Sequence, residues 1–219
     1  MVLDSLRERY RAIRDRRDDV TLRIVRALSW ADRGLAAKEA DDPDAACIFF
    51  WIAFNAMYAR RTDSYSENQE QRDFQEFLDK AKLLDRKGDL VAGLRACWDD
   101  AKAGLIDNRY VYKAFWTVGL AGAGDRRWQE GFERERQQVE RSAQRGDYLP
   151  ALRPLFDRLY VLRNQLHHGG STRAGSLNRQ QVEAGAAVMA QLVPRLIGVI
   201  VDNPDAGWGA PYYPPVPDP

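Results

Sequence analysis

Apolar side chains recur along most of the chain at steps of three and four residues, the spacing that places them on one face of an α-helix. The first series runs from Leu3 to Leu35 with charged residues between its members, and predicts one long amphipathic helix over about residues 3–38. Further series predict core helices over about 43–60, 149–168 and 178–201. No segment shows the alternation typical of a strand, so the sequence predicts an all-α fold.

The region between the second and third of these helices, about residues 62–147, carries shorter apolar series and is expected to be an insertion of extra helices. Within it, Gly104 is expected to break a helix. Tyr110 and Trp116 are expected to be core residues of the aromatic helix that follows and not a platform on which bases stack. A strongly charged segment, 128–145, predicts a solvated surface helix, with contact to a partner as the alternative.

The 219 residues are enough to bury a core in one domain, and a single helical domain is expected over residues 1–205. Residues 206–219 form a proline-rich tail that excludes helix and favours extended polyproline II backbone. We expect a loosely ordered tail in preference to one that docks in an aromatic groove.

An unbroken apolar run, Ala45–Phe54, is too short to span a bilayer, which takes roughly 20 residues. Asp42 is placed to cap a helix whose first residue is Pro43, so the run predicts a helix buried on all sides. Asn55 follows directly and is then a buried polar group that needs a partner. No membrane association is predicted, and the charged start of the chain predicts a cytoplasmic protein.

Net charge and cysteine content narrow the classes of function. A net charge of +1 with 30% charged residues excludes a protein whose whole surface attracts nucleic acid. Cys47 and Cys97 lie singly in apolar helical series, which predicts buried thiols and neither a disulfide framework nor a metal site. No metal and no other cofactor are therefore expected. Basicity is local: residues 153–179 hold one acidic residue, Asp157, against five arginines, Arg153, Arg158, Arg163, Arg173 and Arg179.

The candidate chemistry lies at the end of the predicted helix 149–168, where His167 and His168, the only two histidines, follow Arg163 and Asn164. Histidine exchanges a proton near neutral pH and the planar guanidinium suits phosphate oxygens, so the cluster indicates acid–base chemistry on a phosphodiester. Arg163 and His167 are four residues apart, as are Asn164 and His168, so each pair shares one side of the last helical turn.

A pair of glycines, Gly169–Gly170, follows the histidines and is expected to end the helix. The break would leave His168 at an exposed edge, where the negative end of the helix dipole favours a protonated imidazole. A protonated imidazole beside a guanidinium would bind a phosphate. In the alternative, Arg163 and His168 only cap carbonyl groups at the helix end.

Arg163 and Asn164, followed by three residues and His168 at the end of an apolar helix, resemble the signature of the HEPN superfamily. The buried segment Trp51–Tyr58 resembles a segment common in bacterial HEPN-type proteins, including those called Apea-like. The resemblance covers the first two and last two predicted core helices and not the region between them. It implies a HEPN-like helical bundle that commonly dimerises, often with metal-independent endoribonuclease activity in toxin–antitoxin or antiphage roles.

The resemblance also implies roles for the motif residues. Arg163 would hold the scissile phosphate, Asn164 would orient His168 or the phosphate, and His168 would act as general base or acid. His167 is expected to be an auxiliary residue. Attack by the ribose 2′-hydroxyl would leave a 2′,3′-cyclic phosphate and needs no metal.

RNA is accordingly the expected partner, with Arg158 and Arg173 as contacts from the locally basic part of the chain. A homodimer would bring two copies of His168 into one composite active site, which supplies both a base and an acid. An antitoxin or another component of a defence system is also expected as a partner. Gly170 stands where HEPN toxins controlled by a nucleotidyltransferase often carry a tyrosine, so regulation by modification there is not expected.

Two other classes of function remain open. In the first, the same fold is a non-catalytic dimerisation or scaffolding module, and the middle helices serve a protein partner. In the second, the protein is a nucleotide or small-ligand sensor in which Arg163 and the histidines bind a phosphate without cleaving it. The ribonuclease is favoured because the motif keeps its arginine, asparagine and histidine at the expected spacing.

Overall fold

The computed structural model describes residues 2–60, 66–120, 126–170 and 172–214. Over these ranges the chain forms helices, short 3-10 and π-helical turns and one isolated antiparallel bridge between Arg60 and Pro211, without a strand. The predicted all-α fold is confirmed.

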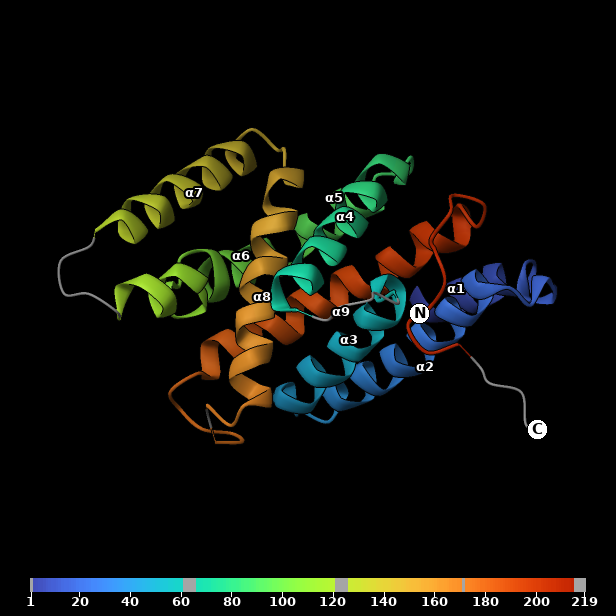
Figure 1. The fold of residues 1–219 in the computed structure, drawn as a ribbon, viewed down its shortest axis with the longest axis horizontal. Helices are drawn as coiled ribbons and strands as arrows, with labels where there is room; N and C mark the ends of the chain where they lie inside the picture. The colour runs from blue at the N-terminus through green and yellow to red at the C-terminus, as the bar shows by residue number, and fades with distance from the viewer. Residues whose placement is uncertain (1, 61–65, 121–125, 171, 215–219) are drawn as a thin grey trace.

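The α-helices in chain order are α1 (Val2–Arg11), α2 (Asp19–Glu39), α3 (Pro43–Tyr58), α4 (Glu67–Leu84), α5 (Asp89–Ala96), α6 (Trp98–Ala101), α7 (Arg127–Gln144), α8 (Leu152–His167) and α9 (Arg179–Asp202). The shorter turns are η1 (Arg14–Arg16), η2 (Lys102–Ile106), η3 (Arg109–Val111), η4 (Phe115–Gly119) and η5 (Leu149–Ala151). Figure 1 shows α8 crossing in front of α9, which runs through the centre of the molecule.

The prediction of one continuous helix over residues 3–38 is wrong, because the chain breaks between α1 and α2. Arg17 adopts a left-handed conformation with φ of 49°, which an α-helix cannot contain. Asp18 then caps α2, since its carboxylate accepts a hydrogen bond of 2.9 Å from the backbone N–H of Thr21. The apolar spacing continues through the break and therefore does not reveal it.

Helix α9 is the central core helix and contacts α2, α3, α5 and α8. It is long and apolar enough to cross a membrane by length and composition, yet 78% of its most apolar stretch is buried inside the fold. Helix α3 lies beside α2 and α9, and Asp42 and Pro43 begin it as predicted. The apolar run Ala45–Phe54 is accordingly part of a core helix.

Helices from the expected insertion complete this core. Phe74 of α4 is fully buried, with ring centroids 6.3 Å from Trp51 of α3 and 5.7 Å from Tyr160 of α8. Buried side chains of α4, α5 and the η2–η3 segment belong to the same cluster as those of α2, α3, α8 and α9. The described part of residues 62–147 therefore shares one core with the four predicted core helices.

Gly104 marks a close approach of two elements, and the expected helix break at this position is wrong. It lies inside η2, which follows α6 without interruption. A Cβ atom on Gly104 would lie 2.2 Å from the Cβ of Ala184 on α9. The two backbones are therefore so close that there is no space for a side chain at position 104. The glycine is present for packing and does not end the helical path.

The tail docks on the helices over its described part, so the expectation of a loosely ordered tail is wrong for residues 206–214. Trp208 is 8% exposed, lies 5.6 Å from the ring of Phe77, and donates its indole N–H to the carbonyl of Asn203 at 2.8 Å. Residues 215–219 of the predicted loose segment lie outside the described residues. The predicted burial of Cys47 and Cys97 is confirmed, and both are free thiols.

Candidate functional site

The Arg-Asn-x-x-x-His motif occupies the last turn of α8 and its C-terminal cap. His167 is the final helical residue and His168 is the C-cap, after which Gly169 takes a left-handed conformation with φ of 68°. Gly170 donates its backbone N–H to the carbonyl of Gln165 at 2.8 Å, which closes the helix end. The prediction that the glycine pair ends this helix is confirmed.

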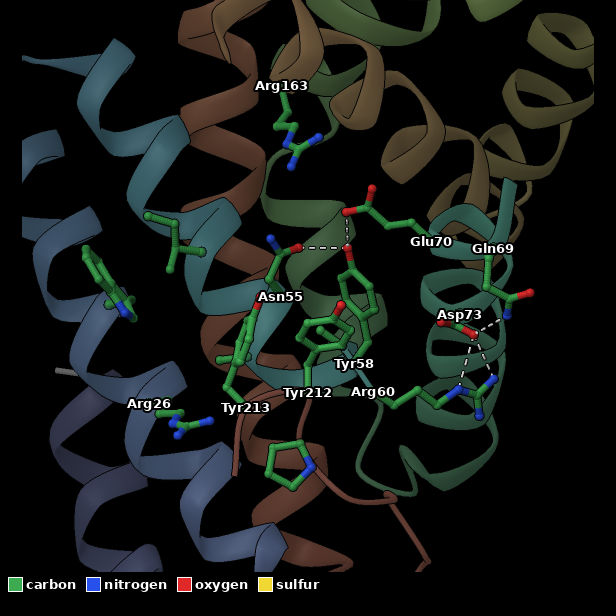
Figure 2. A pocket seen from close by; sticks show the side chains of 15 residues that line it. Arg26, Asn55, Tyr58, Arg60, Gln69, Glu70, Asp73, Arg163, Tyr212 and Tyr213 are labelled. Carbon is green, nitrogen blue, oxygen red and sulfur yellow. Dashed lines mark hydrogen bonds and ion pairs between the residues drawn. The ribbon is translucent and has the colours of Figure 1, made fainter. Parts of the chain in front are cut away.

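Arg163 is half-buried, and its guanidinium is held beside the helix by its neighbour. Nη1 donates a hydrogen bond of 2.9 Å to Oδ1 of Asn164. Nε is buried and has no hydrogen-bond partner among the described residues. Figure 2 shows the guanidinium directed into a cavity. A buried guanidinium N–H without an acceptor is a site at which a ligand oxygen would be stabilised.

The two histidines have different surroundings. His167 is exposed, and its Nδ1 lies 3.1 Å from the carbonyl oxygen of Arg163, so in the neutral ring this nitrogen carries the proton and donates it. His168 is exposed at the helix end and is not among the described residues that line the cavity in front of Arg163. Within one chain, the structure therefore joins Arg163 to Asn164 and His167 and leaves His168 outside the cavity.

The cavity in front of Arg163 has a volume of about 620 Å³ and lies between α2, α3, α4, α8 and the tail. We call it the Arg163 cavity; its walls include Arg26, Trp30, Asn55, Tyr58, Glu70, Arg163 and Tyr213. Residues from the two sequence segments that resemble HEPN proteins, Trp51–Tyr58 and the motif, meet here although more than a hundred positions separate them in the chain.

A hydrogen-bonded network lines the floor of this cavity (Figure 2). The hydroxyl of Tyr58 lies 2.7 Å from Oδ1 of Asn55 and 3.1 Å from Oε1 of Glu70. Tyr160 donates its hydroxyl to Oε2 of the same carboxylate at 3.1 Å. Burial, and then the charge of Glu70, raise the pKa of Tyr58 well above its usual value, so the hydroxyl stays protonated and remains a donor. Asn55 has thus found the partner that the sequence required.

Three arginines and two carboxylates, those of Glu70 and Asp73, line this cavity. Arg60 is paired with Asp73 at 2.8 Å and with Glu76 at 2.5 Å. Arg26 and Arg163, in contrast, form no ion pair with another residue of the described ranges. An anionic group that enters the cavity would therefore meet two guanidinium groups without carboxylate partners.

Arg158 has a structural place that does not fit the expected contact with RNA. Its side chain is 2% exposed and its Nη2 lies 2.5 Å from Oε1 of Glu135 on α7. Its guanidinium also lies 4.4 Å from the ring centroid of Tyr112 and 5.6 Å from that of Phe132. Because this charge is enclosed between α7 and α8, no phosphate can reach it while these helices stay together.

Arg173 is exposed, as an RNA contact would have to be, but it is not free. Its side chain is 78% exposed, and Nη2 forms an ion pair of 2.7 Å with Asp42, the N-cap residue of α3.

Several residues of the Arg163 cavity were not candidates from sequence. Glu70 lies on α4 within the supposed insertion, and Arg26 and Trp30 lie on α2, far from the motif in sequence. The polar residue Asn55 at the end of the apolar run was the one local signal, because it required a hydrogen-bond partner, which is Tyr58 one turn further along α3. Among residues 2–60, 66–120, 126–170 and 172–214, no three histidine, cysteine, aspartate or glutamate side chains are grouped as metal ligands.

Comparisons of the chain with family models, with curated proteins and with solved structures found no match. Function is therefore inferred from the side chains and their geometry. The last turn of α8 offers a guanidinium without a carboxylate partner, an amide that orients it and two exposed imidazoles. These groups can bind a phosphate and exchange protons beside it.

Proposed function

We propose that the protein is a metal-independent endoribonuclease, acting as a toxin or antiphage effector. The observation that carries this proposal is the guanidinium of Arg163 near the end of α8, which has a buried Nε without an acceptor and no carboxylate partner among the described residues. The exposed ring of His168 follows at the C-cap of the same helix. Asn164 contributes by orienting the guanidinium, because its Oδ1 accepts a hydrogen bond of 2.9 Å from Nη1 of Arg163.

In the proposed reaction, the ribose 2′-hydroxyl attacks the adjacent phosphorus and gives its proton to a neutral His168. Arg163 offsets the negative charge that grows on the phosphate oxygens in the transition state. The bond from phosphorus to the 5′-oxygen breaks, and this oxygen takes a proton from a second, protonated imidazole. The products are a 2′,3′-cyclic phosphate and a 5′-hydroxyl. One His168 cannot act as base and as acid in the same step, so we assign the second imidazole to His168 of a partner protomer.

Cleavage of total cellular RNA and of tRNA in the presence of EDTA tests this proposal. We expect the wild-type protein to cut and to leave cyclic phosphate ends, and His168→Ala to lower the rate by about 100-fold or more. Arg163→Met should cause a loss of similar size. The matched control is His167→Ala, which removes a neighbouring exposed imidazole and should have a smaller effect. Cleavage that survives His168→Ala in protein free of contaminating nuclease would contradict the proposal.

A nucleotide sensor is the second candidate, favoured by the aromatic and cationic walls of the Arg163 cavity. Arg26 and Arg163 suit a phosphate, and Trp30 and Tyr213 offer rings to a base. In the same samples, a rise in melting temperature with nucleoside phosphates, lost in Arg163→Met and without RNA cleavage, would support this candidate. A folded dimer that neither cuts RNA nor binds nucleotides would favour the scaffolding module.

A further inference from the structure

A second cavity, of about 680 Å³, adjoins the last turns of α8. We call it the Trp116 pocket; its walls include Tyr110, Lys113, Trp116, Asn164, Gln165 and Leu177. These residues come from the η3–η4 segment, from α8 and from the loop before α9. Figure 1 shows the η3–η4 segment and this loop on the same side of α8. Asn164 belongs to the motif, so the pocket and the candidate active site share a residue.

Two aromatic side chains of this pocket are open to solvent, contrary to the expectation that they are core residues. Tyr110 is 43% exposed and Trp116 is 45% exposed. The indole N–H of Trp116 is donated to the carbonyl of Tyr110 at 2.8 Å, and Phe115 packs edge-on against the indole with centroids 5.2 Å apart. The exposed rings are thus held in place by the protein itself, which lowers the cost of ordering them around a ligand.

Polar groups next to these rings suit the edge of a nucleobase. The amide of Gln165 donates to the carbonyl of Tyr110 at 2.8 Å, while its Oε1 is buried without a hydrogen-bond partner among the described residues. Such an acceptor requires a donor, and the exocyclic amino group of a base is one. Asn164 and Asn178 add amide groups to the same walls.

The charge of the pocket also favours a polyanion. Lys113 is the one charged side chain among its described lining residues, and no carboxylate lines it. Arg109 lies next to it, with its guanidinium 5.0 Å from the ring centroid of Tyr110. Cations interleaved with exposed aromatic rings are the pattern by which proteins hold single-stranded nucleic acid.

We propose that the Trp116 pocket binds an unpaired base of single-stranded RNA, stacked on Trp116 and Tyr110, with the adjoining phosphate at the motif. This proposal rests on the proposed ribonuclease function and names the class of its substrate. A base inside a duplex is stacked between its neighbours and cannot enter such a pocket, so double-stranded RNA is excluded as the preferred ligand.

Equilibrium binding of a fluorescein-labelled 2′-O-methyl oligonucleotide tests this inference without cleavage, because the methyl group blocks the attacking oxygen. We expect Trp116→Ala to weaken binding about tenfold, and Trp116→Phe to restore most of it through its aromatic ring. Leu177→Glu is a second variant that spares the core, because Leu177 is 91% exposed; its carboxylate should weaken binding by repelling the phosphates. The matched control is Leu83→Glu on α4, at a position 81% exposed, which should bind as the wild type does.

The outcomes separate the pocket from the catalytic proposal. Loss of binding in both pocket variants, with a weaker affinity for the matching duplex, supports the pocket even if RNA with free 2′-hydroxyls is never cut. Wild-type affinity in Leu177→Glu, equal affinity for duplex and single strand, or no oligonucleotide binding at all would overturn it. A change in self-association by Leu177→Glu, without RNA binding, would reassign the pocket to contact between two copies of this chain.

Discussion

Arg23 of α2 has no exposed surface and forms no ion pair within the described part of the chain; backbone carbonyl groups accept its hydrogen bonds instead. Nη1 lies 3.0 to 3.2 Å from the carbonyl oxygens of Ala56, Met57 and Ala59 at the end of α3. Nε and Nη2 donate to the tail carbonyls at positions 209 and 210, at 3.1 and 2.8 Å. Burial lowers the pKa of Arg23 to about 10, so the guanidinium is still charged at neutral pH.

Replacement of Arg23 should therefore unfold the protein more easily. We expect Arg23→Met to lower the free energy of unfolding by about 3 kcal/mol, because it leaves buried carbonyl groups without donors. Urea unfolding followed by circular dichroism measures this change. Arg26→Met, one turn further along α2, is the matched control and should change stability by less than about 0.5 kcal/mol. Equal stability of the two variants would show that water satisfies the carbonyls when Arg23 is absent.

At the residue scale, the sequence predicted positions that depend on close neighbours and missed those that depend on distant ones. The helix end at Gly169–Gly170 follows from the backbone freedom of glycine within one turn. The burial of Arg158 depends on Glu135 of another helix, and the exposure of Trp116 depends on how η4 leaves the core. The spacing of apolar residues predicts neither the burial of Arg158 nor the exposure of Trp116.

At the scale of elements, helix existence was predicted better than helix continuity. Helix α3 was predicted with its N-cap, because Asp42 and Pro43 act within one turn. The break before α2 was missed, because Arg17 is not a residue type that favours a left-handed conformation. The tail was expected to be loose because a proline-rich composition predicts extended backbone and does not indicate that Trp208 packs against the helices.

The contact between η2 and α9 gives a prediction for a pair of elements. Gly104→Ala should cost about 2 kcal/mol of stability, because the added methyl group overlaps the side chain of Ala184. Ala184→Gly alone should cost about 1 kcal/mol through its helix propensity. The double variant should be more stable than the sum of the single effects predicts, as measured by urea unfolding. Strict additivity would mean that η2 moves away from α9 without cost.

At the scale of the whole molecule, one continuous core joins helices from every part of the described chain. Cys47 and Cys97 are buried in it, and Cys47 Sγ lies 3.2 Å from the carbonyl oxygen of Val182 on α9. Burial raises the pKa of the Cys97 thiol to about 11 and that of Cys47 further. Both thiols are therefore protonated and covered in the native state.

We expect both thiols to resist an alkylating reagent at pH 8 in the native protein and to react in urea, as counted by mass spectrometry. The same pKa shift makes stability depend on pH. Between about pH 9 and pH 11 the unfolded chain loses the Cys97 proton and the native protein keeps it, so the free energy of unfolding falls as pH rises. Cys97→Ala should make the free energy of unfolding depend less steeply on pH in this range. Equal rates of alkylation in buffer and in urea would contradict the burial of both thiols.

The hydrogen bond between Arg163 and Asn164 connects two separate cavities. Arg163 lines one and Asn164 lines the other, and 2.9 Å separates the bonded atoms. A ligand that takes the Asn164 amide for itself changes how firmly the guanidinium is held, and a ligand on the guanidinium changes the amide in turn. Binding in the two cavities is thus thermodynamically linked: a ligand in one cavity changes the affinity for a ligand in the other by some factor, and the second ligand changes the affinity for the first by the same factor.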